Sequence, residues 1–232
     1  YEDDVLPRSG YTMNITIDKN LPTTFRVLQD ENMVPKQLFF YNFSASPSFG
    51  SDEQWFQIVV VNIDEHVTDY SPFPDKTFTQ NNNLGFGATK AWEQTYTYPQ
   101  GGNKTWSLGP VDYDNQVFTV WCKETRQWYG YSLTNGQMLW GPTEPQPAYD
   151  MYGNAGLIAY GNLYSGYLGG VLHCYDIKTG NLKWTYEAAG IGYESPYGNY
   201  PIGYGGGLMA ADGKIFLYST EHSPTQPLWR GA

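Results

Sequence analysis

Charged residues and long apolar runs are scarce in this sequence. Of its 232 residues, 13 are basic and 23 are acidic, which gives a net charge of −10. An acidic chain without basic clusters repels phosphate backbones, so we expect no nucleic-acid partner. The longest apolar stretch, residues 56–61, is far too short to cross a bilayer, so we expect no transmembrane segment.

Cysteine and histidine are equally sparse. Cys122 and Cys174 lie in strand-like runs, either as two separate buried thiols or as a disulfide. His66, His173 and His222 are isolated and lack the spacing of metal ligands, so no metal site is expected. The sequence also lacks the Gly-x-Ser-x-Gly signature of a serine nucleophile, and no catalytic residue is assigned.

Aromatic and turn-forming residues are abundant instead. The chain has 21 Tyr, 11 Phe and 8 Trp, which is 40 aromatic side chains, together with 26 Gly and 15 Pro. The aromatic residues can fill a sizeable core, and the Gly and Pro residues divide the chain into short segments joined by turns. No segment has sustained helical periodicity, so the composition favours an all-β fold.

A repeat runs through the second half of the chain. Residues 129–140 and 173–184 align without gaps, and their final tryptophans are 184 − 140 = 44 residues apart. Each segment predicts a hairpin with a turn at Asn135-Gly136 or Thr179-Gly180, where glycine takes a positive φ, and a returning strand that ends in Trp.

Another strand follows a turn at each repeat of this pattern. The turns begin at 114, 160 and 212, and the strands that follow them span 117–122, 163–167 and 214–218. A period of about 45 residues with four short strands is typical of a β-propeller blade. We therefore predict an all-β propeller of four-stranded blades, with about three blades plus a partial one in this chain.

The first hundred residues fit this scheme less regularly. Strand patterns lie at 38–44, 55–63 and 85–98, and the last contains Trp92, 48 residues before Trp140. The predicted organisation is a single propeller domain or fragment over 1–232. Its parts are an irregular first region at 1–105, a long loop at 64–84, an extra strand at 13–18 and regular repeats at 106–232.

Two motifs resemble a known repeat. Residues 174–184, which contain the Asp-Ile-Lys-Thr-Gly turn and Trp184, are followed by an Asp-Gly turn and strand at 211–218. This combination resembles the repeat of the pyrroloquinoline-quinone (PQQ)-like propeller family. The stretch from 108 to 232, including residues 121–130, is similar to secreted or surface-anchored archaeal members of uncharacterised function. The resemblance implies an extracellular or cell-surface location.

The same resemblance covers both enzymes and scaffolds. The family includes quinone-dependent alcohol and sugar dehydrogenases, and also an outer-membrane assembly scaffold lipoprotein without a cofactor. In the dehydrogenases, a disulfide between adjacent cysteines lies against the quinone, and a Glu, Asn and Asp set holds calcium. This sequence has no adjacent cysteines, and eight blades of about 45 residues would exceed its 232. We expect neither PQQ nor calcium.

Two connections between blades are the predicted ligand-binding region. Segments 147–154 and 193–204 precede inner strands and are rich in Tyr and Gly. Tyr rings there could stack on sugars while Asp, Glu and Asn bond their hydroxyls, or the same rings could simply pack between blades. The candidate ligand-binding residues are Asp150, Tyr152, Asn154, Glu194, Tyr197 and Tyr204.

Other carboxylates and three sequons complete the candidates. Asp112 and Asp114 flank Tyr113 in a turn, where Asp commonly bonds the backbone, although paired carboxylates can also hydrolyse glycosides. Asp64-Glu65 is interpreted as a solvated loop or part of a calcium site. The Asn-x-Ser/Thr glycosylation sequons begin at Asn14, Asn42 and Asn103.

These features together predict a non-catalytic extracellular or surface propeller that serves in binding or assembly. An incomplete ring leaves a strand edge open, which a protein partner or another copy could fill by strand addition, with residues 13–18 as a donated strand. A glycan is a further candidate ligand. The alternative is a carbohydrate- or alcohol-acting enzyme, including a PQQ-dependent dehydrogenase, with Asp150 or Glu194 as its acid or base.

Overall fold

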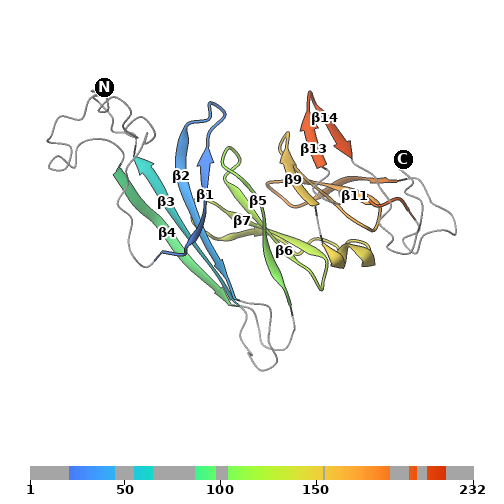
Figure 1. The fold of residues 1–232 in the computed structure, drawn as a ribbon, viewed down its shortest axis with the longest axis horizontal. Helices are drawn as coiled ribbons and strands as arrows, with labels where there is room; N and C mark the ends of the chain where they lie inside the picture. The colour runs from blue at the N-terminus through green and yellow to red at the C-terminus, as the bar shows by residue number, and fades with distance from the viewer. Residues whose placement is uncertain are drawn as a thin grey trace, which may run out of the picture. The chain divides into compact units, whose positions relative to one another are not determined.

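The computed structural model describes residues 21–44, 55–64, 87–97, 104–153, 155–188, 199–202 and 208–217. The chain divides into two compact units. The first comprises Tyr1–Asn42 and Gln57–Gln94, and the second comprises Phe43–Phe56 and Thr95–Ala232. The predicted all-β fold is confirmed, because the described residues form three four-stranded antiparallel sheets and one two-stranded sheet (Figure 1).

The first sheet lies mainly in the first unit and has the strand order β1-β2-β3-β4. Its strands are β1 (Thr24–Gln29), β2 (Pro35–Phe43), β3 (Trp55–Asp64) and β4 (Gly87–Thr97). Asp30 forms the turn between β1 and β2, where its Oδ1 accepts hydrogen bonds from the backbone N–H groups of Asn32 (2.9 Å) and Val34 (3.0 Å). Leu38, Phe40, Val59, Val61 and Ile63 form a buried cluster on this sheet.

The second unit contains the remaining sheets. The second sheet is formed by β5 (Trp106–Asp112), β6 (Val117–Cys122), β7 (Gln127–Ser132) and β8 (Met138–Trp140). A 3-10 helix, η4 (Ala148–Tyr152), leads to the third sheet, which is formed by β9 (Ala155–Ala159), β10 (Asn162–Gly166), β11 (Val171–Asp176) and β12 (Leu182–Glu187). The last is the pair β13 (Leu208–Ala211) and β14 (Lys214–Leu217). In each sheet, chain neighbours are also spatial neighbours.

The predicted hairpin repeat is confirmed at the level of individual hydrogen bonds. The backbone N–H of Gly136 bonds the carbonyl of Ser132, and that of Gly180 bonds Asp176, both at 2.8 Å. Both glycines have positive φ, 76° and 70°. The two outer hairpins are therefore the same structure, 180 − 136 = 44 residues apart.

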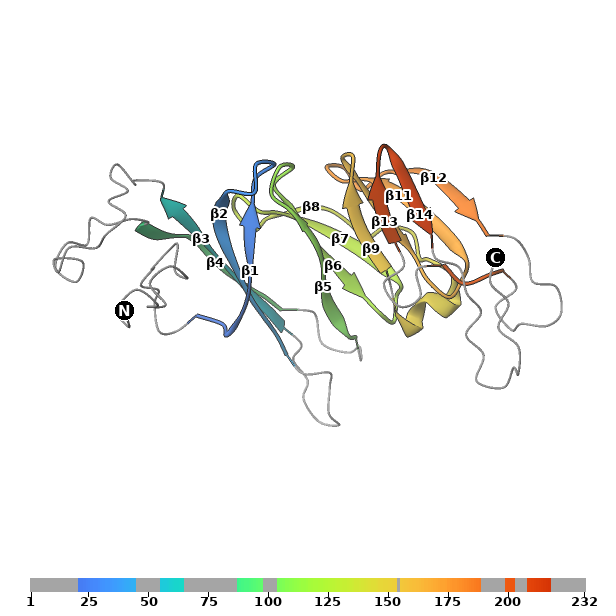
Figure 2. The same cartoon turned by 45° about the horizontal axis from the view of Figure 1, so that its top comes forward.

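Successive sheets of the second unit meet through their first strands. Strand β9 lies against β5 and also against β13, as its position beside β13 in Figures 1 and 2 shows. Between the second and third sheets, Trp128 and Trp140 are buried with Leu163, Tyr175 and Ile177. First strands gathered side by side, with side chains packed between neighbouring sheets, are the arrangement of propeller blades.

Two segments predicted from the sequence are not among the described residues. The strand at 13–18 and residues 65–84 of the long loop lie outside the described residues, and the organisation of 1–232 as one propeller domain remains a prediction. Among the described residues, no helix has the length and hydropathy needed to cross a membrane. Cys122 and Cys174 are free and buried in different sheets, β6 and β11, so the disulfide alternative is not realised.

Candidate functional site

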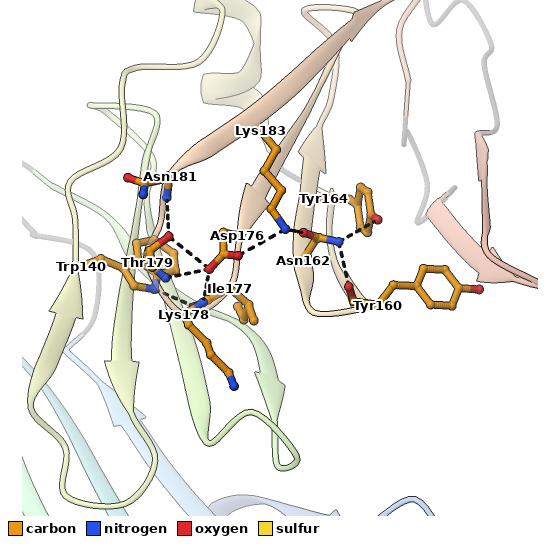
Figure 3. Close-up of polar contacts among 10 residues, drawn as sticks. All are labelled: Trp140, Tyr160, Asn162, Tyr164, Asp176, Ile177, Lys178, Thr179, Asn181 and Lys183. Atoms are coloured by element: carbon orange, nitrogen blue, oxygen red, sulfur yellow. Dashed lines mark hydrogen bonds and ion pairs between the residues drawn. The ribbon is translucent and has the colours of Figure 1, made fainter.

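Trp140, the last residue of β8, connects the second sheet to the third. Its indole Nε1–H donates to the carbonyl of Ile177 at 2.7 Å, and the residue is only 7% exposed (Figure 3). Its ring lies between two glycines: a Cβ at Gly180 would lie 2.5 Å from the ring, and a Cβ at Gly130 would overlap the indole. Glycine at these positions lets the Trp lie flat against both backbones.

The turn that receives Trp140 is held in shape by Asp176. Its Oδ1 accepts hydrogen bonds from the backbone N–H groups of Lys178 and Thr179, both at 3.0 Å, and its Oδ2 lies 3.2 Å from Lys183 Nζ (Figure 3). Lys183 also donates to Asn162 Oδ1 at 2.7 Å. Burial disfavours the charged form of Asp176, but Lys183 and the N–H donors outweigh it and lower its pKa.

Tyr96 makes the corresponding contact one repeat earlier in the second unit. Its hydroxyl donates to the carbonyl of Gly136 at 2.6 Å, and its ring stacks on Phe56 with centroids 4.3 Å apart. Burial raises the pKa of this hydroxyl strongly. Tyr96 lies 140 − 96 = 44 residues before Trp140, so it occupies the repeat position for which the sequence suggested Trp92.

Trp184 occupies the same repeat position on β12, but it is 44% exposed. The inner part of the sheet face that carries it is covered: Leu172 and Cys174, which pair with Tyr186 and Trp184, pack with Ile202 and Leu208. The outer part is open, because every residue of β12 is exposed. The described residues thus supply a cover for Trp140 and none of comparable extent for Trp184.

A second candidate region surrounds η4, in the connection between β8 and β9. Asp150 has an exposed fraction of 0%, and its Oδ1 accepts a hydrogen bond from the backbone N–H of Gly169 at 2.7 Å. Its Oδ2 has no hydrogen-bond partner among the described residues. Burial raises the pKa of Asp150 to about 7, although the Gly169 bond and the charge of Arg126 act in the opposite direction.

The burial of Asp150 gives this residue a structural contact, while its predicted ligand-binding role stays a prediction. A general acid with a pKa near neutrality suits catalysis, but this carboxyl is enclosed by protein and directed at the turn between β10 and β11. Its hydrogen bond to Gly169 holds the connection against that turn.

Tyr152, in contrast, is 66% exposed and stacks with Tyr149, with centroids 6.5 Å apart and rings inclined by 19°. The connection also touches Tyr167, because a Cβ at Gly153 would lie 2.9 Å from that ring. The backbone carbonyl of Tyr167 accepts a hydrogen bond from the backbone N–H of Ile202 at 3.0 Å. Parts of the two predicted segments therefore meet at one place. Asn154, Glu194, Tyr197 and Tyr204 lie outside the described residues.

A buried polar chain beneath this region was not predicted. Trp128 Nε1–H donates to Ser165 Oγ at 2.8 Å, Ser165 Oγ donates to Gln146 Oε1 at 3.1 Å, and Gln146 Nε2 donates to Tyr175 at 3.3 Å. These hydrogen bonds join β7 and the β8–β9 connection to the third sheet. Its residues are far apart in sequence, so only the Trp128 and Tyr175 strand patterns could have indicated their burial.

The structure also describes the turn carboxylate Asp112, the histidine His173 and one of the three sequon asparagines. Asp112 has the predicted turn role, since its carboxylate accepts hydrogen bonds from the backbone N–H (3.1 Å) and side chain (2.8 Å) of Asn115. His173 stacks on Tyr175, and burial lowers its pKa. Asn42 is exposed on β2, while Asn14 and Asn103 lie outside the described residues.

The residues present do not fit the quinone and calcium of the dehydrogenases. Cys122 and Cys174 lie in different sheets and cannot form the disulfide that lies against the quinone. Within the described ranges, no group of three His, Cys, Asp or Glu side chains is arranged to hold a metal ion.

The described part of the chain is all-β, with four-stranded antiparallel sheets in which strands follow one another in chain order. No family model matches the sequence, and no curated protein matches it. Solved structures of similar fold include BamB from Moraxella catarrhalis, with 11% identity, a TM-score of 0.40 and coverage of 82% of this chain and 42% of that one. A europium-containing methanol dehydrogenase has 16% identity, a TM-score of 0.36 and coverage of 73% and 26%. This chain spans less than half the length of either protein.

Proposed function

We propose that this chain is a non-catalytic propeller segment that serves in binding or assembly, and that it joins a partner through the outer face of β12. The observation that carries the proposal is the difference between two equivalent residues: Trp140 is 7% exposed and Trp184 is 44% exposed. Exposing a large aromatic ring and its apolar neighbours costs free energy, and contiguous exposed apolar surface is typical of interaction sites.

The proposed location is extracellular or at the cell surface, as an archaeal-type surface glycoprotein. Its support is the sequence resemblance to secreted archaeal members, the low content of charged residues and the three sequons. Of these sequons, the structure describes only Asn42, which is exposed.

Light scattering over a series of protein concentrations tests the proposal. We expect the chain to associate as concentration rises, because copies cover one another's apolar face when nothing else does. Trp184→Lys should remain monomeric, since a buried ammonium group would oppose contact. Met138→Lys is the matched control, because Met138 is an exposed apolar residue on the other outer strand, β8. A monomeric wild-type chain, or equal association of Trp184→Lys, would contradict the proposal.

A second candidate function is carbohydrate binding at η4. It is favoured by the parallel Tyr149–Tyr152 pair, of which Tyr152 projects into solvent. Exposed tyrosine rings offer an apolar face for a sugar ring and a hydroxyl for polar contact. A glycan array should show binding that Tyr152→Ala abolishes and Tyr160→Ala, a change at another exposed tyrosine, preserves. Binding that is equal in both variants would place any glycan elsewhere.

A further inference from the structure

We infer that the Asp150 carboxyl is a proton-dependent latch, which holds η4 against the turn between β10 and β11 when it is protonated and releases η4 when it is ionised. The position of the stacked Tyr149 and Tyr152 rings, which η4 carries, therefore depends on pH. The inference is independent of the partner proposed for β12.

Three contacts join η4 and its flanking residues to this turn. Asp150 Oδ1 accepts a hydrogen bond from the backbone N–H of Gly169 at 2.7 Å. Pro147 lies against the same glycine, because a Cβ at Gly169 would overlap the proline ring, and Gly153 lies against the ring of Tyr167. Of these three contacts, only the hydrogen bond involves a carboxyl group, so protonation acts on the attachment of η4 through Asp150.

The surroundings of Asp150 favour its neutral form when η4 is attached. The residue has an exposed fraction of 0%, and its Oδ2 has no hydrogen-bond partner among the described residues. A protonated carboxyl is neutral and still offers Oδ1 as the acceptor for Gly169. An ionised carboxyl places a full charge in the same enclosed position with one oxygen unpaired, which costs far more free energy. Release of η4 into water removes this cost.

Arg126, in the turn between β6 and β7, is the charged side chain that opposes this effect. Within the described part of the chain, its charge is the only one that acts on the pKa of Asp150. Its Nε–H donates to the carbonyl of Gln146 at 2.8 Å, so part of the guanidinium is already engaged by the backbone. Burial outweighs the charge of Arg126, and the pKa of Asp150 is raised.

The other titratable groups near Asp150 do not compensate a carboxylate. Burial raises the pKa of Tyr175 on β11, and the negative charges of Asp150 and Glu144 raise it further, so this phenol stays neutral. The turn between β10 and β11, residues 167–170, has the phenol of Tyr167 and no charged side chain.

The difference in pKa sets the size of the effect. With η4 attached, the pKa of Asp150 is about 7, and a released side chain has its ordinary value of 3.8. Because the attached form has the higher pKa, attachment is fully stabilised below pH 3.8 and weakens as the pH rises toward 7. The ratio of released to attached molecules should therefore rise by roughly a few hundredfold between pH 4 and pH 7.

Amide exchange of the full chain, followed residue by residue by NMR between pH 4 and pH 7, tests the inference. Each rate is divided into the intrinsic rate of an unstructured amide at the same pH, which gives a protection factor. We expect the protection factor of the Gly169 amide to fall by roughly a few hundredfold over this range. The reference is the Leu133 amide, which donates to the carbonyl of Gln116 at 2.8 Å in the second sheet and should change much less.

Asp150→Asn is the test variant, because an amide cannot ionise and keeps an oxygen acceptor for Gly169. Its Gly169 protection factor should not change with pH. Asp114→Asn is the matched control, because Asp114 is an exposed aspartate in the turn between β5 and β6. This variant should keep the wild-type profile.

The wild-type profile is decisive even if Asp150→Asn does not fold. A constant Gly169 protection factor overturns the inference, because η4 then stays attached over an ionised carboxyl. An equal fall at Gly169 and Leu133 also overturns it, since the second unit then opens as a whole and η4 is not released locally. A fall in Asp150→Asn as large as that in the wild type would assign the effect to another group.

Discussion

Trp140, at the end of β8, and Trp184, within β12, occupy the same repeat position in two successive sheets, but only Trp140 is covered. Both follow an irregularity in strand pairing, between Gly130 and Tyr131 for the first and between Cys174 and Tyr175 for the second. Both hairpins have the same turn hydrogen bonds. The strand and turn are therefore built by the sheet itself, while burial of the tryptophan requires the neighbouring sheet.

The largest expected difference between the two positions is in stability. Trp140→Ala removes a buried ring and its hydrogen bond, which should lower the free energy of unfolding of the second unit by about 3–5 kcal/mol. Trp184→Ala removes an exposed ring from the same repeat position and should cost less than about 1 kcal/mol. Urea denaturation followed by circular dichroism measures both. Equal losses would show that exposure does not distinguish the two positions.

The next expected effect is a pH dependence of stability that comes from the buried carboxyl of Asp150 in η4. The folded-state pKa of Asp150 is raised from 3.8 to about 7, so its contribution to stability is fully present below pH 3.8 and is lost as the pH rises toward 7. The unfolding free energy should fall over this range by up to about 4 kcal/mol. Asp150→Asn, which cannot ionise but keeps an oxygen acceptor for Gly169, should remove this component.

Denaturation of the wild type and of Asp150→Asn at a series of pH values measures the difference between them. A difference that does not change between pH 4 and pH 7 would mean that this carboxyl titrates in the folded state as it does in the unfolded chain.

The smallest expected effect tests the glycine beneath Trp140. Gly180→Ala combines a positive φ with a Cβ 2.5 Å from the Trp140 ring. Gly213→Ala has nearly the same φ, +69°, with no atom within 4 Å of the added Cβ. The control should cost about 1 kcal/mol from backbone strain, and Gly180→Ala about 1–3 kcal/mol more from overpacking. Similar melting temperatures for the two variants would mean that Trp140 does not press on this turn.

The repeated part of the fold was predictable because its signals are local. Strand β6 has the bounds predicted from its sequence, 117–122, and the turns at Gly136 and Gly180 have the positive φ expected of them. Strand β1 was missed. Five of its six residues are exposed, so its side chains give little apolar alternation, and its pairing with β2 maintains it as a strand.

The candidate site was less predictable because it depends on contacts between distant residues. Asp150 is in a polar, turn-rich segment where Asp is normally exposed, and it is buried through a contact with Gly169, 19 residues away. Tyr96 was overlooked because the comparison of repeats followed tryptophan, although its 44-residue spacing marks the position. The prediction failed at this position because it required a tryptophan, whereas the 44-residue period alone locates Tyr96.

The acceptors of Tyr96 and Trp140 are backbone oxygens, which every amino acid provides. Substitutions at position 177 therefore keep the atom to which the indole binds, although the buried Ile177 side chain still has to fill its place beside the ring. Selection on such a joint acts mainly on the donor ring and on the glycine that makes room for it. The joint between neighbouring sheets thus depends on the course of the main chain through the turn, which the glycine sets.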